Sequence, residues 1–195
     1  MSVIRVNPES VASYGRDAQS RFDQIHHELT ALVTGVADVR YFGPNALAFK
    51  TGSAEMAADF ANRFSKDIGQ IADSIRVNTS NISSALGGQP INITVNGALI
   101  QVPQIASSDI VDIDLTALES LSSLIKQHFT LITDHIDRHL EKLVATDWLG
   151  RSKEATVEAV RTFTAIAKSK CDEAQQNLSH RIQEQISAVQ QADAQ

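Results

Sequence analysis

The sequence predicts an all-α protein with two tandem antiparallel helical hairpins, which form an elongated four-helix bundle with a small β-hairpin in the linker between repeats. Apolar residues recur every three or four positions over two long blocks. Each block breaks once, at a glycine, and the two blocks align without gaps at an offset of 107 residues, from Gly43 to Gly150. The chain therefore divides into a first hairpin over 7–86, a linker over 87–113 and a second hairpin over 114–192.

The first hairpin begins at Asn7, a favourable N-cap, with Pro8 at the first helical position. Its first helix carries an apolar stripe made of Val11, Tyr14, Ala18, Phe22, Ile25, Leu29, Leu32 and Val36. The pattern breaks at Tyr41-Phe42-Gly43-Pro44, where Gly relaxes the backbone and Pro restarts a helix. The second stripe consists of Phe49, Met56, Phe60, Phe64, Ile68, Ile71, Ile75, Ile82 and Leu86, and Gly87-Gly88 ends the helix.

The second hairpin repeats this plan with a break at Trp148-Leu149-Gly150. Its first stripe is Leu118, Leu121, Ile125, Phe129, Ile132, Ile136, Leu140 and Leu143. Its second stripe is Val160, Phe163, Ala167, Cys171, Ala174, Leu178, Ile182, Ile186 and Val189. The shared phase, turn position and helix lengths indicate an internal duplication. Because a lone hairpin leaves apolar residues uncovered, we expect the two hairpins to pair within one chain, with pairing between two chains as the alternative.

The linker contains two alternating runs, Ile91–Val95 and Ala98–Val102, around Asn96-Gly97. Asn-Gly between such runs predicts a two-residue β-turn that would place Ile93 opposite Ile100. An isolated hairpin is only marginally stable in water, so its apolar face would cover the helices. Edge pairing with another chain, or with the segment Ser2–Val6, is the alternative.

Composition excludes several classes of protein. The 195 residues contain 17 Lys and Arg against 23 Asp and Glu, a net charge of −6, which disfavours a nucleic-acid binder. The single Cys171 cannot form an internal disulfide. We expect neither a cleaved leader nor a membrane span, since no apolar run is long enough for either.

Trp148-Leu149-Gly150 at the bend of two long amphipathic helices resembles the motif of the WXG family, the early-secreted-antigenic-target-like hairpin proteins of type VII secretion. Tyr41-Phe42-Gly43 occupies the same place in the first hairpin, with Tyr in place of Trp. Family members often pair as antiparallel dimers of hairpins, and many leave the cell folded. The resemblance implies a binding and secretion function without catalysis, with a secretion-system component or another WXG-like protein as partner. It also implies a location outside the cell reached without a cleaved signal peptide, or a cytoplasmic one.

One feature departs from the family. Members or their partners usually carry a Tyr-x-x-x-Asp/Glu export signal, whereas here Ala18 follows Tyr14 and Asn45 follows Tyr41 at the fourth position. A signal-bearing partner, or a cytoplasmic scaffold or adaptor that is not exported, would explain this departure. Trp148 itself has two possible functions, closing the end of the hairpin or contacting a partner from a partly exposed position.

Other residues that could carry chemistry have simpler explanations. His128, His135 and His139 share a helical face and could bind a metal or respond to pH, but the repeat places them at ordinary polar or core-edge positions. Cys171 aligns with Phe64 on the apolar stripe, as a small buried residue would. We find no phosphate loop, nucleophile elbow or paired acids, and therefore predict no enzyme activity and no cofactor.

Overall fold

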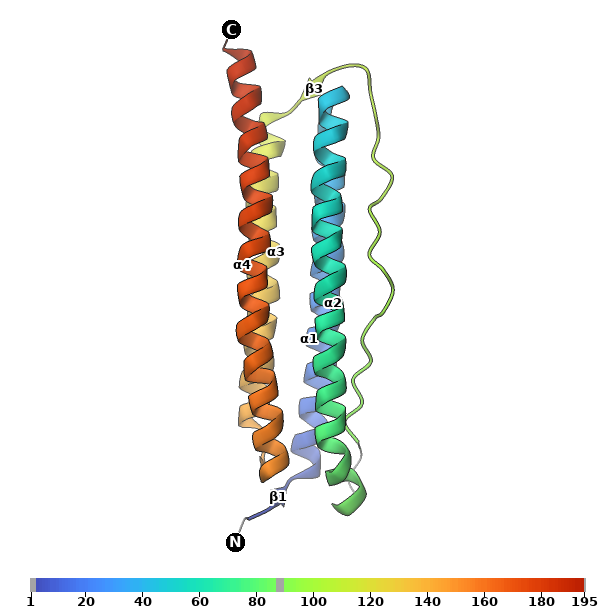
Figure 1. Cartoon of the computed structure of the whole chain (residues 1–195), viewed down its shortest axis with the longest axis vertical. Coiled ribbons are helices and arrows are strands. Elements are labelled where there is room, and N and C mark those ends of the chain that lie inside the picture. The colour runs from blue at the N-terminus through green and yellow to red at the C-terminus, as the bar shows by residue number, and fades with distance from the viewer. Residues whose placement is uncertain (1–2, 87–89, 195) are drawn as a thin grey trace. The chain divides into compact units, whose positions relative to one another are not determined.

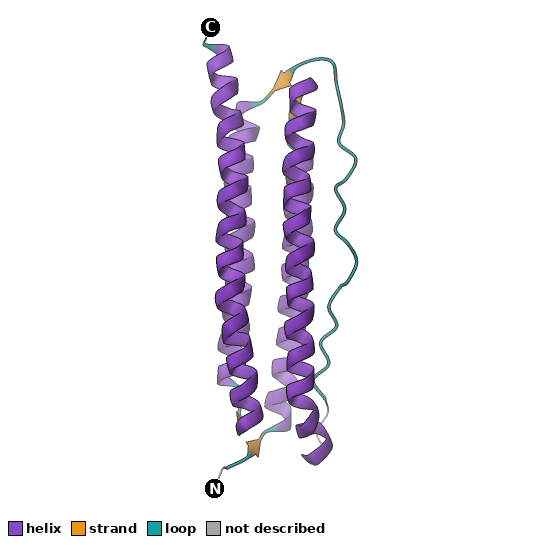
Figure 2. Cartoon of the chain, viewed as in Figure 1, coloured by secondary structure: helices purple, strands orange, loops and turns teal. Residues whose placement is uncertain are grey.

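The computed structural model describes residues 3–86 and 90–194 and confirms the all-α, four-helix fold (Figure 1, Figure 2). The helices are α1 (Pro8–Ala37), α2 (Pro44–Leu86), α3 (Leu115–Ala145) and α4 (Arg151–Asp193). Four two-residue strands accompany them: β1 (Arg5–Val6), β2 (Tyr41–Phe42), β3 (Asp112–Ile113) and β4 (Trp148–Leu149). Both predicted breaks are therefore real bends. The predicted helix end at Gly87-Gly88 and the side chain of Leu86 lie outside the described residues.

The chain forms two compact units, and each contains a segment of all four helices. Unit 1 comprises Met1–His26, Phe64–Gly97 and Thr133–Ser169, and unit 2 comprises His27–Arg63, Ala98–Ile132 and Lys170–Gln195. Each unit is therefore a four-helix bundle to which both hairpins contribute. The second bend belongs to unit 1 and the first bend to unit 2.

Most of the predicted apolar stripes form the core. All eight stripe residues of α1 are buried, as are seven of the eight on α3, where Leu140 is half-buried. In α2 the stripe differs from the prediction, because Met56 is 38% exposed while Ala54, Ala57 and Ala61 are buried. Small residues let neighbouring helices approach closely, so this stretch of α2 buries alanines, which a pattern built on large side chains overlooks.

The short strands pair across the repeat. In unit 1, β1 pairs antiparallel with β4, and in unit 2, β2 pairs antiparallel with β3. The offset of 107 residues relates β1 to β3 and β2 to β4. The segment that precedes one hairpin therefore always pairs with the bend of the other hairpin. This symmetric exchange supports the duplication independently of the apolar pattern.

The linker does not form the predicted β-hairpin. Residues 90–111 contain no strand, and Asn96-Gly97 does not turn the chain back (Figure 2). The alternation is real, since Ile91 and Ile93 are buried between exposed neighbours, but it marks one face of an extended segment laid on helices. The reason is topological: α2 ends in unit 1 whereas α3 begins in unit 2, so the linker has to travel onward between them. The alternative pairing of the linker with the segment before the first hairpin is not formed by Arg5–Val6, because this strand, β1, pairs with β4.

Candidate functional site

The two bends have the same backbone conformation. Gly43 and Gly150 adopt φ values of 123° and 132°, a region that favours glycine because a side chain would clash there. The N–H of each motif's first residue also bonds in the same way: the Tyr41 N–H donates to the Val39 carbonyl and the Trp148 N–H to the Thr146 carbonyl, each at 2.8 Å. The motif glycines are thus required by the turn itself.

The preceding segments are tied to the bends by matching hydrogen bonds. In unit 1 the Asn7 N–H donates to the Asp147 carbonyl at 2.9 Å, and in unit 2 the Asp114 N–H donates to the Arg40 carbonyl at 3.4 Å. Asn7 and Asp114 then cap the helices that follow, each accepting backbone N–H bonds with its side chain.

An ion pair accompanies each of these contacts, with its polarity reversed. Arg5 pairs with Asp147 at 2.7 Å in unit 1, whereas Asp112 pairs with Arg40 at 3.4 Å in unit 2. Arg5 and Asp112 are equivalent in the repeat, as are Asp147 and Arg40. A pairing of two copies of the first hairpin would bring Arg5 against Arg40. The charges therefore favour pairing of the first hairpin with the second.

The ring of each motif is buried. Trp148 is 1% exposed and Tyr41 is 3% exposed, and the Tyr41 hydroxyl accepts a hydrogen bond from Gln185 Nε2 at 2.6 Å. Burial raises the pKa of the Tyr41 phenol above its ordinary value. Of the two functions predicted for Trp148, the ring performs the structural one in unit 1. Leu149, which is 50% exposed, is the residue of this motif that a partner could contact.

A lysine donates hydrogen bonds to backbone carbonyls at each bend. Lys50 Nζ, buried in unit 2, donates to the Val39 carbonyl at 3.1 Å and lies 4.7 Å from the centre of the Phe42 ring. Lys153 Nζ in unit 1 donates to the Val144 and Thr146 carbonyls at 3.0 and 2.7 Å. Burial lowers the pKa of both ammonium groups. Lys153 thus satisfies a carbonyl in the last turn of α3, where a positive charge is favoured, and Lys50 satisfies a carbonyl just past the end of α1.

Exposed apolar side chains surround both bends. Val3 and Ile4 are 70% and 68% exposed in unit 1, and their repeat equivalents Ile110 and Val111 are 75% and 64% exposed in unit 2. Beside the first bend a groove of about 460 Å³ opens, lined by Phe42, Pro44, Val111, Ile113, Gln185 and Val189 among others. Such apolar surface is what a protein–protein contact uses.

The three candidate histidines have separate partners. His128 Nδ1 lies 2.5 Å from Glu28 Oε2 in unit 2. In unit 1, His135 Nδ1 lies 3.4 Å from Arg21 Nη1, and His139 Nε2 lies 2.9 Å from the Tyr14 hydroxyl. Within residues 3–86 and 90–194, no three His, Cys, Asp or Glu side chains are grouped to hold one metal ion.

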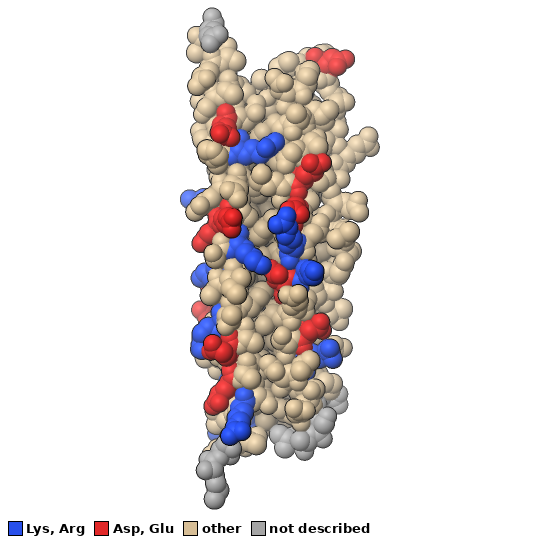
Figure 3. Space-filling view, in the orientation of Figure 1, with Lys and Arg blue, Asp and Glu red and all other residues tan. Residues whose placement is uncertain are grey.

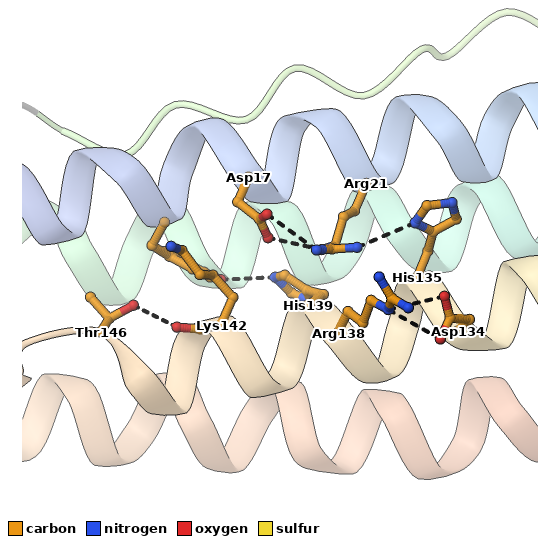
Figure 4. Close-up of polar contacts among 9 residues, drawn as sticks. Asp17, Arg21, Asp134, His135, Arg138, His139, Lys142 and Thr146 are labelled. Atoms are coloured by element: carbon orange, nitrogen blue, oxygen red, sulfur yellow. Dashed lines mark hydrogen bonds and ion pairs between the residues drawn. The ribbon is translucent and has the colours of Figure 1, made fainter.

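Tyr14 and His139 form a polar layer in the core of unit 1. Both are 0% exposed, and the His139 ring also lies against Phe22, with ring centres 4.9 Å apart. Burial lowers the pKa of His139 to about 4, and Asp17 and Arg21 act on it in opposite directions (Figure 4). His139 Nδ1 is buried without a hydrogen-bond partner. The histidine is thus neutral near pH 7, and its protonation would place an uncompensated charge in the core.

Cys171 occupies the core position that its alignment predicted. It is buried, and burial raises the pKa of its thiol to about 12. A thiol in this state is protonated at neutral pH and is a poor nucleophile.

Neither the outer surface nor the comparisons with known proteins identify what this protein does. Acidic and basic side chains are interspersed on the face shown in Figure 3, as on an ordinary solvated surface. In the part of the chain that the structure describes, no helix has an apolar stretch long enough to cross a bilayer. No family model, curated protein or solved structure matches this chain.

Sequence reasoning missed the exchange of segments at the bends. The signal was present in the sequence. The offset of 107 residues aligns Arg5 with Asp112 and Arg40 with Asp147, so that each of these positions carries opposite charges in the two repeats. It was not readable before the structure showed which residues face one another. The amides that hold the linker, Gln19 and Asn62, gave no signal at all, because their partners are backbone atoms.

Proposed function

We propose that this chain is a non-enzymatic tandem WXG-like protein associated with type VII secretion, acting by protein–protein interaction as a substrate, a co-secreted partner or a chaperone. The supporting observation is the exchange at the two bends, where each hairpin supplies the strand that completes the bend of the other. In the family that the motif resembles, two hairpins commonly pair as a dimer. Here one chain supplies both hairpins, and the reversed ion pairs favour that match.

The bends are the surfaces we assign to partner binding. Their rings and glycines build the turn, while Leu149 and the apolar residues that precede each hairpin are exposed. The partner would be a secretion-system component or another WXG-like protein. The protein itself would be a monomer if the hairpins pair within one chain, and a dimer if they pair between chains.

A cytoplasmic scaffold or adaptor with the same fold is the second candidate. Both tyrosines are buried, Tyr14 at 0% and Tyr41 at 3% exposure, and neither is followed by an acid four residues later. Neither can therefore present the Tyr-x-x-x-acid signal. Export would then depend on a partner that carries the signal.

Localisation in the source cells tests the proposal. Culture filtrate and lysate are blotted for this chain, with a cytosolic protein as the control for lysis. The chain in the filtrate without lysis supports secretion, whereas the chain in the lysate alone supports the scaffold.

A matched pair of variants tests the bend as the binding surface. Leu149→Glu and Ile166→Glu change residues of equal exposure in unit 1, at 50% and 52%, but only Leu149 belongs to the motif. We expect Leu149→Glu to abolish export or partner capture and Ile166→Glu to leave both unchanged. Equal effects of the two substitutions would contradict this assignment.

A further inference from the structure

Asn96-Gly97 lies in the most exposed part of the linker. Both residues are exposed, as are Ala98 and Leu99 after them, and none of the four belongs to a strand. A β-carbon added at Gly97 would meet no atom within 4 Å, so the space beside its backbone is open. The sequence predicted a tight β-turn here, whereas the structure leaves this dipeptide in a solvent-facing segment outside any sheet.

This exposed stretch is anchored on both sides. In unit 1 the Gln19 side-chain amide bonds to both backbone groups of Thr94, each at 2.7 Å. In unit 2 the Asn62 amide bonds in the same way to Ile100, at 3.0 and 2.8 Å. Residues 96–99 can therefore change conformation locally while the linker stays attached to both units.

An asparagine can react with its own backbone when the next residue permits it. Its Cγ lies close along the chain to the following backbone nitrogen, and a bond between the two atoms closes a five-membered ring. The reaction requires an N–H on the following residue, freedom of the torsion angles between the two atoms, and room around the attacking nitrogen.

Most asparagines of this chain fail the first two requirements. Asn7 precedes Pro8, which has no N–H. Five others lie in α2 or α4, where the helical backbone fixes the torsion angles that ring closure has to change: Asn45, Asn62, Asn78, Asn81 and Asn177. Asn92 and Asn96, both exposed in the linker, remain.

The following residue separates these two linker asparagines. Asn92 precedes Ile93, which is β-branched and 9% exposed, so its side chain crowds the nitrogen and its burial holds the backbone. Asn96 precedes Gly97, which has no β-carbon and leaves its nitrogen accessible. Asn96 therefore meets all three requirements.

A contact with α1 orients the Asn96 side chain without locking it. Asn96 Nδ2 lies 3.1 Å from His26 Nε2. Because an amide nitrogen is a donor only, Nδ2 donates to the imidazole in this contact. One exposed hydrogen bond of this kind slows departure from its geometry by about tenfold at most.

We propose that Asn96 is a site of spontaneous deamidation, with water as the co-reactant. The Gly97 nitrogen attacks Asn96 Cγ and gives its proton to solvent, the Cγ–Nδ2 bond breaks, and the side-chain nitrogen leaves as ammonia. Water then opens the cyclic imide. Cleavage of the new N–Cγ bond gives an aspartate at position 96, whereas cleavage of the original peptide bond gives an isoaspartate, in which the chain continues through the side chain. Both products gain one negative charge, and no atom is oxidised or reduced.

The modification is independent of the proposed secretion function. It falls between the Thr94 and Ile100 anchors, away from the bends and the buried stripes. We expect residues 96–99 to accommodate the additional backbone carbon of isoaspartate, so that the modified protein keeps its helical content and its melting temperature.

Incubation of the purified full chain at neutral pH tests the site. Mass spectrometry of proteolytic peptides that contain the linker follows the exchange of the side-chain NH₂ for OH. An isoaspartate-specific carboxyl methyltransferase with labelled S-adenosylmethionine detects the isoaspartate. We expect the change to accumulate at Asn96 and not at Asn92, its matched control in the same linker. Equal rates at the two asparagines would overturn the proposal.

A free peptide with the sequence of residues 90–102 gives the rate in the absence of the fold. We expect Asn96 in the full chain to react within about tenfold of its rate in the peptide, the limit set by the His26 contact. A slower reaction in the full chain would mean that the fold protects Asn96, and the proposal would fail.

Substitution of the glycine provides the last test. Gly97→Ile copies the Asn92-Ile93 pair and should suppress the reaction, whereas Gly69→Ala, at an equally open position in α2, should leave the rate unchanged. Circular dichroism establishes that both variants fold, and if Gly97→Ile does not, the comparison of Asn96 with Asn92 in the wild type still decides. Modification of Asn96 at the wild-type rate in folded Gly97→Ile would contradict attack by the Gly97 nitrogen.

Discussion

Equivalent positions of the repeat hold a tyrosine and a histidine in unit 1 but two leucines in unit 2. Tyr14 corresponds to Leu121 and His139 to Leu32, and all four side chains are buried. The bends differ in the size of their ring, with Trp148 closing one and Tyr41 the other. One backbone plan therefore accepts a polar or an apolar layer and a larger or smaller ring. At these positions the stability of unit 1 is therefore expected to be sensitive to acid, whereas that of unit 2 is not.

The largest expected effect comes from removing a bend ring. Trp148→Ala should lower the free energy of unfolding by about 4 kcal/mol, because a fully buried large ring is replaced by a cavity. Tyr41→Ala should cost somewhat less, since the phenol is smaller. Urea unfolding followed by circular dichroism measures both, with Leu149→Ala as the exposed control. A Trp148→Ala variant as stable as Leu149→Ala would mean that the ring does not close the core.

Acid should next distinguish the polar layer of unit 1 from the apolar layer of unit 2. Folding lowers the pKa of His139 from 6.5 to about 4, so the unfolded chain binds a proton more readily than the folded one. This contribution to stability is complete above pH 6.5 and is lost as the pH falls towards 4, by about 3 kcal/mol at 1.36 kcal/mol per unit. Tyr14 bonds to this histidine, and Asp17 and Arg21 are the charged groups that act on its pKa.

The control for this prediction copies unit 2 into unit 1. The double substitution Tyr14→Leu with His139→Leu removes the histidine without leaving the tyrosine hydroxyl unpaired. We expect the double variant to lose this part of the pH dependence of the unfolding free energy between pH 6.5 and 4. Parallel curves for the wild type and the double variant would show that His139 does not cause the acid sensitivity.

The two bend glycines sharpen the comparison further. Gly43→Val and Gly150→Val should each cost about 2 kcal/mol, because valine strongly disfavours a positive φ. Gly43→Val should cost more, since its β-carbon would lie 3.2 Å from Val111 Cγ2, whereas the nearest atom to that of Gly150 is Ile4 Cγ1 at 3.7 Å. Thermal melts rank the variants. Gly69→Ala lies in mid-helix, where a β-carbon meets no atom within 4 Å, and should stabilise the protein. If Gly150→Val melts with the wild type, the bend tolerates a side chain.

The reversed ion pairs should give the smallest effect. Arg5→Asp places two carboxylates opposite one another and should cost under about 1 kcal/mol, since the Arg5 and Asp147 side chains are 64% and 39% exposed. Adding Asp147→Arg recreates the polarity of unit 2 and should restore stability at low salt. A double-mutant cycle without any coupling would show that these charges do not contribute to the match of the hairpins.

Local patterns in the sequence determined much of this protein. The spacing of apolar residues fixed the helices, because burial on one face of a helix requires it. The glycines at positions 43 and 150 fixed the bends, because few other residues adopt their φ values. The duplication followed from the common offset, and the core positions of Tyr14, Phe22 and Cys171 followed from their place in the stripes.

Tertiary structure alone decided the rest. The linker has the sequence of a β-hairpin, yet it is extended because α2 ends in unit 1 while α3 begins in unit 2. Met56 lost its place in the core to alanines because helix separation, which no local pattern encodes, decides which side chains fit. Strands β1 and β3 pair with bends that lie more than 60 positions away in the chain. The hydrogen bond between Tyr14 and His139 likewise joins residues more than 60 positions apart. Such contacts depend on how the hairpins meet, and periodicity along the chain carries no information about that.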